Sequence, residues 1–291
     1  MSPRLIATVQ AVAVCFVWSI SFLITKRLYE YGVGPLTLTG LRFGLAAAVL
    51  APLWWFRSRR GGVRRRLRPR VVIALGIAGY AVNPAGYHLA LAMADASWVG
   101  VLLAVGNTLQ VLAWSAVILG ERPTRVQLAA MATAVIGIWV FAWPTGGAES
   151  VVPVLSVVVG GAGYALWVVG GRVIMREADP VALASACMLA GAAPTLVAGL
   201  LIEGPPRLPV VAWALIALLA VVNTACAFVV WNHTQRVLPA YESAIVNNTM
   251  TVQVALLAFA FLGDPLGVRQ WAAIGVVTAA ILAVQLMKPD P

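Results

Sequence analysis

The sequence predicts an all-α integral membrane protein with ten transmembrane helices, built as two five-helix repeats that cross the membrane in opposite senses. Three features lead to this prediction: the composition, a series of long apolar runs, and an internal repeat. Of the 291 residues, 62% are hydrophobic and only 10% are charged, whereas soluble domains are near half apolar and a quarter charged. A soluble globule of this size cannot bury so much apolar surface, so the composition excludes a soluble enzyme, a disordered chain and a secreted disulfide scaffold.

The apolar runs have the length that a bilayer requires, because a hydrocarbon core of about 30 Å needs about 20 residues of helix. Clusters of Gly, Pro and charged residues, such as GERPT and EGPPRLP, separate the runs and indicate helix ends. Most connections are short, so we expect successive helices to be antiparallel neighbours, with no room for a second soluble domain. The runs cover residues 5–25, 35–56, 71–93, 97–119, 126–143, 151–174, 181–202, 210–231, 240–262 and 271–287.

The basic residues predict the orientation of these spans. Eight of the 20 Lys and Arg residues lie in the segment 57–70, and the net charge of +10 is therefore a topology signal rather than a sign of nucleic-acid binding. If that loop is cytoplasmic, fifteen basic residues lie on the cytoplasmic side and four on the other. Both termini are then predicted to be cytoplasmic.

The internal repeat relates the two halves of the chain at an offset of 143 residues without a gap. LGERPTRVQLA, from Leu119, aligns with LGDPLGVRQWA, from Leu262, and the same offset pairs Tyr80 with Asn223. Five spans per copy is an odd number, so the second copy must cross the membrane in the opposite sense, as in many secondary transporters. We expect one repeat at residues 1–146 and the other at residues 147–291.

Several motifs, in order along nearly the whole chain, resemble the EamA-type transporters of the drug/metabolite transporter superfamily, including its exporters of aromatic amino acids. The first run has Trp18, Ser19, Phe22 and Lys26 at that family's opening spacing; the motifs further along the chain are Pro35 followed by Arg42-Phe43, the two LG(E/D) sequences with their glutamines Gln127 and Gln270, and Ala165-Leu166-Trp167. The resemblance implies a basket of ten helices around a central cavity lined mainly by spans 1, 3, 4, 6, 8 and 9, with spans 5 and 10 peripheral. The chain departs from the family at Thr108 and Thr251, where many members have proline.

Chemistry that depends on clustered acids or metal ligands is excluded by the positions of the candidate groups. All ten Asp and Glu residues lie at the ends of runs or in loops, which argues against a buried carboxylate relay and a membrane-embedded lipid enzyme. Two distant histidines cannot form a zinc site, and the three cysteines, Cys15, Cys187 and Cys226, read as small buried hydrophobes. We therefore expect no catalytic residue, no metal and no cofactor.

The remaining polar and aromatic residues inside the spans are the candidates for a substrate pathway. Neutral hydrogen-bonding groups and aromatic walls suit a small amphipathic or zwitterionic solute, although such amides also join helices to one another. For Trp98, Trp231 and Tyr241, near span ends, an interfacial aromatic belt is an equal alternative. The pathway candidates are Trp18, Ser19, Tyr80, Asn83, Tyr87, His88, Asn107, Gln110, Trp114, Tyr164, Trp167, Asn223, Asn247, Asn248 and Gln253.

Four further residues have more specific interpretations. Arg42 is the only charge within a span and is interpreted as a structural anchor, with a contact to a substrate carboxylate as the alternative. His88 is either a core histidine with its hydrogen bonds satisfied or a titrating group. Glu121 and Asp264 are expected to cap the helices that follow them, with a role as substrate ligands as the alternative.

The sequence therefore predicts a transporter in a bacterial plasma membrane that moves small metabolites by alternating access. The family resemblance implies that it exports them. Amino acids, with hydrophobic or aromatic ones favoured, are the expected substrates, and facilitated diffusion is preferred over proton coupling through His88. Import, or exchange of another metabolite or drug, is the main alternative; a lipid enzyme and a non-transporting scaffold or receptor are weaker ones. The expected partners are the substrate and the lipid bilayer, the chain being a monomer or a weak homodimer.

Overall fold

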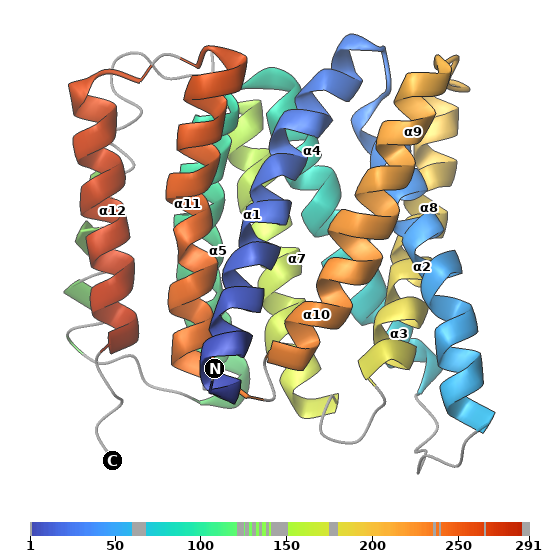
Figure 1. The fold of residues 1–291 in the computed structure, drawn as a ribbon, viewed down its shortest axis with the longest axis horizontal. Helices are drawn as coiled ribbons and strands as arrows, with labels where there is room; N and C mark the ends of the chain where they lie inside the picture. Colours follow the sequence, from blue (N-terminus) through green and yellow to red (C-terminus); the bar gives the residue numbers. More distant parts are fainter. Residues whose placement is uncertain are drawn as a thin grey trace.

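The computed structural model describes residues 2–59, 68–120, 125, 128–129, 132–133, 136–137, 140, 151–174, 180–234, 237–238, 240–264 and 266–286, and within these ranges the regular structure is helical. Figure 1 shows the helices side by side in one bundle. They are α1 (Pro3–Glu30), α2 (Pro35–Arg59), α3 (Pro69–Gly76), η1 (Ile77–Val82), α4 (Asn83–Met93), α5 (Ala96–Leu119), α7 (Val152–Ile174), α8 (Pro180–Ile202), α9 (Val210–Leu218), η2 (Leu219–Cys226), α10 (Ala227–Thr234), α11 (Ala240–Leu262) and α12 (Val268–Leu286).

Nine of the ten predicted runs coincide with continuous helical stretches in the described part of the chain, because α3–η1–α4 and α9–η2–α10 are each one unbroken stretch. The predicted run 126–143 lies largely outside the described residues. Six stretches are long and apolar enough to cross a membrane by themselves: Pro3–Glu30, Pro35–Leu53, Ala96–Ile118, Val152–Gly170, Val181–Ile202 and Val210–Trp231. The protein is thus a multi-pass helical membrane protein.

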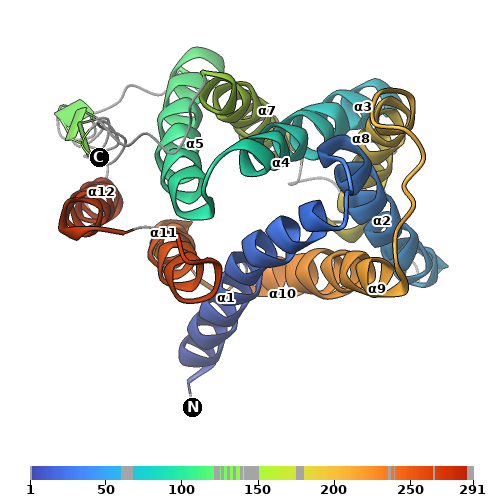
Figure 2. The same ribbon diagram turned by 90° about the horizontal axis from the view of Figure 1, so that it is seen from above.

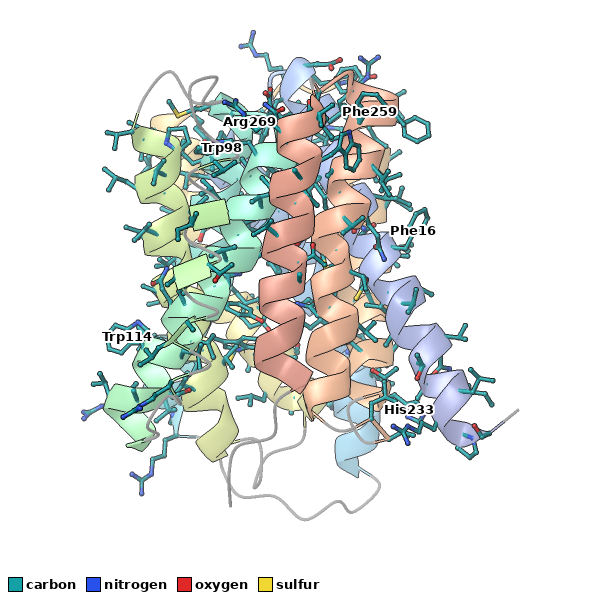
Figure 3. All side chains as sticks on the ribbon, turned by 90° about the vertical axis from the view of Figure 1, so that its left-hand side faces the viewer. Phe16, Trp98, Trp114, His233, Phe259 and Arg269 are labelled. Atoms are coloured by element: carbon teal, nitrogen blue, oxygen red, sulfur yellow. The ribbon has the colours of Figure 1, made fainter. Side chains whose placement is uncertain are left out.

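The outer surface of the bundle is apolar. Val117 is 77% exposed and Phe261 is 73% exposed, and Phe16 and Phe259 project from the bundle in Figure 3. Large exposed apolar side chains on many helices would be unfavourable in water, but they are favourable against lipid tails. The surface therefore agrees with the bilayer that the composition predicts.

The second helices of the two halves, α2 and α8, pack tightly and run antiparallel. Thr37 lies against Gly199, Gly40 against Leu196, and Ala47 accepts a hydrogen bond from Ser185 at 3.2 Å. A Cβ atom added at Gly40 would lie 2.5 Å from the Cβ of Leu196, so the backbones approach as closely as glycine allows.

The first helices of the two halves also run in opposite directions. Helix α1 is parallel to α4, because Phe22 stacks on Tyr87 and, further along the chain in both, the Lys26 Nζ donates to the Ala94 carbonyl just past the end of α4. Helix α7 is antiparallel to that same stretch, because Gly160 lies beside Asn83 whereas Gly170, later in α7, contacts Leu75, earlier in α3.

Seen from above, α5, α7, α4 and α3 follow one another along one side of the bundle, and α11, α1, α10 and α9 along the other (Figure 2). Helix α12 packs against α11 at the edge, where the family resemblance places the tenth span. The contact between α7 and η1 depends on glycine, since a Cβ atom at Gly163 would lie 2.4 Å from the Ala78 carbonyl oxygen.

Candidate functional site

A buried arginine lies at the junction of the two halves. Arg42 is in the middle third of the apolar stretch Pro35–Leu53, and 4% of its surface is exposed. Its Nε donates to the Thr224 hydroxyl in η2 at 2.9 Å, and its Nη1 donates to the Tyr87 hydroxyl in α4 at 3.0 Å. Among the described residues no carboxylate lies within ion-pair distance of this guanidinium. We call Arg42, Tyr87 and Thr224 the Arg42 cluster.

Aromatic rings from both halves adjoin this cluster. The Tyr80 ring, in η1, is the hub: its centroid lies 5.5 Å from those of Phe43 and Trp167 and 6.2 Å from that of Phe228. Phe43 also lies beneath the Arg42 guanidinium, at 5.5 Å. The Tyr80 hydroxyl is buried and has no hydrogen-bond partner in the structure.

The same set of rings continues along α10 to α1. The Trp18 ring lies 5.4 Å from Phe228 and 5.2 Å from Trp231. Trp231, which is partly buried, thus belongs to the same set of contacting rings. We call Trp18, Phe43, Tyr80, Trp167, Phe228 and Trp231 the aromatic cluster; Tyr164 borders it through Trp167.

His88 is fully buried next to the Arg42 cluster, with its ring centroid 4.2 Å from that of Tyr87. Its Nδ1 lies 2.6 Å from the Thr39 hydroxyl, which also donates to the Pro35 carbonyl at 2.8 Å. Because a hydroxyl has one proton, Thr39 accepts from Nδ1 when it donates to Pro35, which makes Nδ1–H the favoured tautomer. Nε2 is then an unprotonated acceptor, buried and without a partner. Only one of the two ring nitrogens of His88 therefore has a hydrogen-bond partner.

Two π-helical segments position much of this site. η1 and η2 occupy equivalent places in the two halves, since residues 77–82 shifted by the repeat offset fall within 219–226. In η2 the Thr224 hydroxyl donates to the Leu219 carbonyl, five residues earlier, at 2.9 Å. π-bulges of this kind are frequent at functional sites because they re-aim side chains within a continuous helix. The sequence gives no signal for η2, whereas Pro84, which cannot donate a backbone hydrogen bond, is a signal for irregularity near η1.

Most of the predicted amide candidates join helices. Asn83 Nδ2 donates to the Gly160 carbonyl at 3.1 Å and Gln110 Nε2 to the Val158 carbonyl at 2.9 Å. Asn223 and Trp18 connect α1 to η2: Asn223 Nδ2 donates to the Val17 carbonyl, and Trp18 Nε1 donates to the Asn223 carbonyl at 2.8 Å.

The remaining candidates are spread more widely. Ser19 donates to Gln253 Oε1 at 3.0 Å, joining α1 to α11. Asn107 Oδ1 is buried without a partner, while Trp114 is partly exposed near the far end of α5 from Trp98 (Figure 3). Asn247 is partly buried, and the side chains of Asn248 and Tyr241 lie outside those described. The structure thus brings Trp18, Tyr80, Tyr87, His88, Trp167 and Arg42 together and separates them from Trp114.

Two carboxylates cap helices, but not in the way the sequence predicts. Asp264 is expected to cap the helix that follows it; instead its Oδ2 accepts from the Ser97 backbone N–H at 3.0 Å and from the Ser97 hydroxyl at 2.9 Å, at the start of α5. The expectation is wrong because α12 begins only at Val268, four residues after Asp264. At the start of α12 the Gly267 N–H donates to Gln270 Oε1 instead. Glu203, which the sequence analysis missed, accepts from the backbone N–H groups of Leu36 and Thr37 at 2.8 Å each.

Three charged groups, Lys26, Asp95 and Asp264, lie close together at the end of the bundle where α5 begins. Lys26 Nζ lies 2.5 Å from the Ala94 carbonyl oxygen. Burial raises the pKa of Asp95, the Asp264 carboxylate raises it further, and the Lys26 ammonium opposes both effects. Trp98, 5% exposed, is packed in the core at this end and does not form part of an exposed belt.

A hollow of about 430 Å³ opens on the outer face between α1 and α11, lined by Thr8, Val9, Val12, Ala13, Phe16 and Gln253. It is apart from the Arg42 cluster, and the central cavity implied by the resemblance stays a prediction. Among the described residues no group of three or more His, Cys, Asp or Glu side chains could hold a metal ion. Cys15 and Cys187 are buried as expected, but Cys226 is exposed.

Comparison with known proteins establishes the family. The sequence model of the EamA-like transporter family matches residues 5–143 and again residues 152–286. The chain belongs to the EamA-like transporter family, within the drug/metabolite transporter superfamily. It is also 27% identical over 276 residues to the Bacillus subtilis (strain 168) protein named "Uncharacterized transporter YyaM", covering 88% of each chain.

A solved crystal structure has the same fold. It superposes with a TM-score of 0.71 at 23% sequence identity, over 96% of this chain and 98% of the other. This likeness supports the helical architecture described above. The family membership makes the protein a membrane transporter.

Proposed function

We propose that this EamA-family transporter exports amino acids, with hydrophobic or aromatic ones favoured, by alternating access. The observation that carries the proposal is the aromatic cluster, whose rings come from α1, α2, η1, α7 and α10 and therefore from both halves of the chain. Such rings give the apolar side chain of an amino-acid substrate a favourable surface. Neighbouring hydroxyl and amide groups can form hydrogen bonds with the polar groups of that substrate.

An inverted repeat is the structural basis of the proposed mechanism. The opposite directions of α1 and α7, the antiparallel packing of α2 with α8, and the equivalent positions of η1 and η2 support it. The two stretches of family similarity support halves divided near residue 146. Rocking of one half against the other would then expose a site between them to each side in turn.

The location follows from the same reasoning. We propose a bacterial plasma membrane with both termini in the cytoplasm, supported by the excess of Lys and Arg in the segment 57–70 and by the Bacillus relative. The start of α1 and the end of α12 lie at the same end of the bundle (Figure 1).

The test is flux of radiolabelled amino acids in proteoliposomes, with and without a pH gradient. We expect phenylalanine and related amino acids to move down their gradients, and Trp167→Ala to slow them at least tenfold because it removes one wall of the aromatic cluster. Val117→Ala, on the lipid-facing surface, is the matched control and should leave the flux unchanged. If no amino acid of a broad panel moves, the substrate assignment fails and the family assignment stands.

The pH gradient separates the two modes of transport. Facilitated diffusion predicts the same initial rate with and without the gradient, in wild type and in His88→Gln. A rate that depends on the gradient in wild type and loses that dependence in His88→Gln would instead establish proton coupling.

A further inference from the structure

We infer that the Arg42 cluster is a binding site for one carboxylate group of the transported molecule, whose apolar part lies against the rings around Tyr80. This inference rests on the proposed function and names the chemistry by which the substrate is held. Arg42 supports it in four ways: through its charge, its hydrogen bonds, its lack of a counterpart in the second half, and its being the only buried Lys or Arg among the described residues.

The first step is the charge. A guanidinium is a permanent positive charge on the chain. A buried charge with no opposite charge is among the most costly arrangements in a folded protein. The hydrogen-bond partners of Arg42 are the neutral hydroxyls of Thr224 and Tyr87. An anion supplied from outside the chain would compensate this charge.

The second step is the direction of the hydrogen bonds. Thr224 uses its proton on the Leu219 carbonyl, so toward Arg42 it can only accept. Tyr87 accepts from Arg42 Nη1 and keeps its own proton free to donate. The guanidinium and the Tyr87 hydroxyl together therefore offer donors side by side, which is the arrangement that a carboxylate accepts.

The third step is the comparison with the second half. The repeat offset places Ser185 of α8 at the position equivalent to Arg42, and Ser185 donates to the Ala47 carbonyl at 3.2 Å. Packing of α2 against α8 thus uses a small neutral residue where the other half has a guanidinium. The charge is not a requirement of the helix contact. Its partners come from α4 and η2, one from each half, which places it where alternating access would expose it to either side.

The fourth step uses the number of buried cations to infer the class of anion that the site binds. Among the described residues Arg42 is the only buried Lys or Arg. A diphosphate or a phosphate dianion would need a second cation for compensation. One guanidinium beside Phe43 and Tyr80 instead suits a monocarboxylate with an apolar or aromatic body.

The experiment compares two ligands of the same shape that differ in charge: 3-phenylpropionate and 3-phenylpropionamide. Their dissociation constants are measured at pH 7 with the full-length protein in detergent micelles, from the rise in unfolding temperature with ligand concentration. We expect wild type to bind the acid at least 30-fold more tightly than the amide, since losing one partner of a buried charge pair has effects of that size. Arg42→Gln should abolish the preference, and Arg42→Lys, which keeps the charge but not the planar fork, should retain part of it. Ser185→Ala, at the equivalent position, should retain all of it.

Equal affinity of wild type for the acid and the amide, or failure to bind either, overturns the inference, and this result does not depend on any variant being folded. A folded Arg42→Gln protein that still prefers the acid overturns it as well. Because binding is measured without transport, the two proposals fail separately. An acid preference without amino-acid flux removes the proposed function and leaves the site, whereas flux without an acid preference does the reverse.

Discussion

Helices α2 and α8 occupy equivalent places in the two halves and pack against each other, yet they differ at one decisive position. Both use small residues at the contact: Gly40 and Gly44 in α2, and Ala192 and Gly199 in α8. Only α2 carries a charge, Arg42, where α8 has Ser185. The packing requirement is common to both halves and the electrostatic one is not.

This difference separates what the fold needs from what a substrate needs. Close contact between helices in lipid depends on small side chains because no hydrophobic driving force acts between apolar helices there. A buried guanidinium, in contrast, destabilises the folded state unless an opposite charge compensates it. The two halves therefore share this packing, whereas the charge used by the proposed carboxylate site is present in one of them.

The largest expected effect comes from a substitution that disrupts the packing of α2 against α8. A Cβ atom at Gly40 would lie 2.6 Å from the Leu196 backbone, which cannot move aside, so Gly40→Ala should lower the free energy of unfolding by about 3 kcal/mol. Gly44→Ala is the matched control one turn along, because its Cβ atom would meet Ala192 at an ordinary 3.7 Å. It should leave stability unchanged or raise it by up to about 1 kcal/mol. Denaturant unfolding in micelles measures both, and equal effects of the two variants would contradict this account of the contact.

A smaller effect concerns the carboxylates that tie the halves together at the helix ends. Glu203→Ala removes the acceptor for two N–H groups at the start of α2, and Asp264→Ala does the same for Ser97 at the start of α5. Each should lower the free energy of unfolding by about 1–2 kcal/mol, the usual cost of losing a cap. Glu30→Ala, which removes an exposed pair with Arg27, should change it by less than about 0.5 kcal/mol. Equal losses for all three variants would argue against specific capping.

The smallest effect is a pH dependence at that same end. The pKa of Asp95 is raised in the folded state, so the folded protein binds its proton more tightly than the unfolded chain does. Its contribution to stability is therefore fully present below the unfolded pKa of about 3.9 and is lost as the pH rises through the folded pKa. Asp95→Asn should remove this decline, leaving a flatter curve of unfolding temperature as the pH rises above about 4. Parallel curves for the variant and wild type would show that Asp95 carries no such coupling.

Much of the fold follows from the sequence because span length and helix ends are local properties. The predicted run 181–202 and the observed helix Pro180–Ile202 differ by one residue, and Pro180 supplies the start signal. The run 5–25 ends too early, since α1 continues to Glu30: the polar residues Lys26 and Arg27 end an apolar run without ending a helix. The repeat offset also anticipates the equivalent places of η1 and η2, though not their π-helical hydrogen bonds.

The site is less predictable because its contacts lie between segments far apart in the chain. Tyr80, Trp167 and Trp18 are foreseen as candidates, but nothing local indicates that Tyr80 is the hub that joins Phe43 and Phe228. The capping by Glu203 and Asp264 depends in the same way on which helix end comes near.

The most direct test of the central claim, two halves inserted in opposite senses, is the sidedness of two equivalent glycines. Gly120 and Gly263 end α5 and α11, with φ of 70° and 71° and no atom within 4 Å of an added Cβ. Each is replaced singly by Cys in a protein whose own three cysteines are changed to Ala, at a strain of about 1–2 kcal/mol. A membrane-impermeant maleimide is then applied to sealed right-side-out and inside-out vesicles. The account predicts that Cys at position 120 reacts from the cytoplasmic face and Cys at position 263 from the opposite face; reaction of both from one face would contradict it.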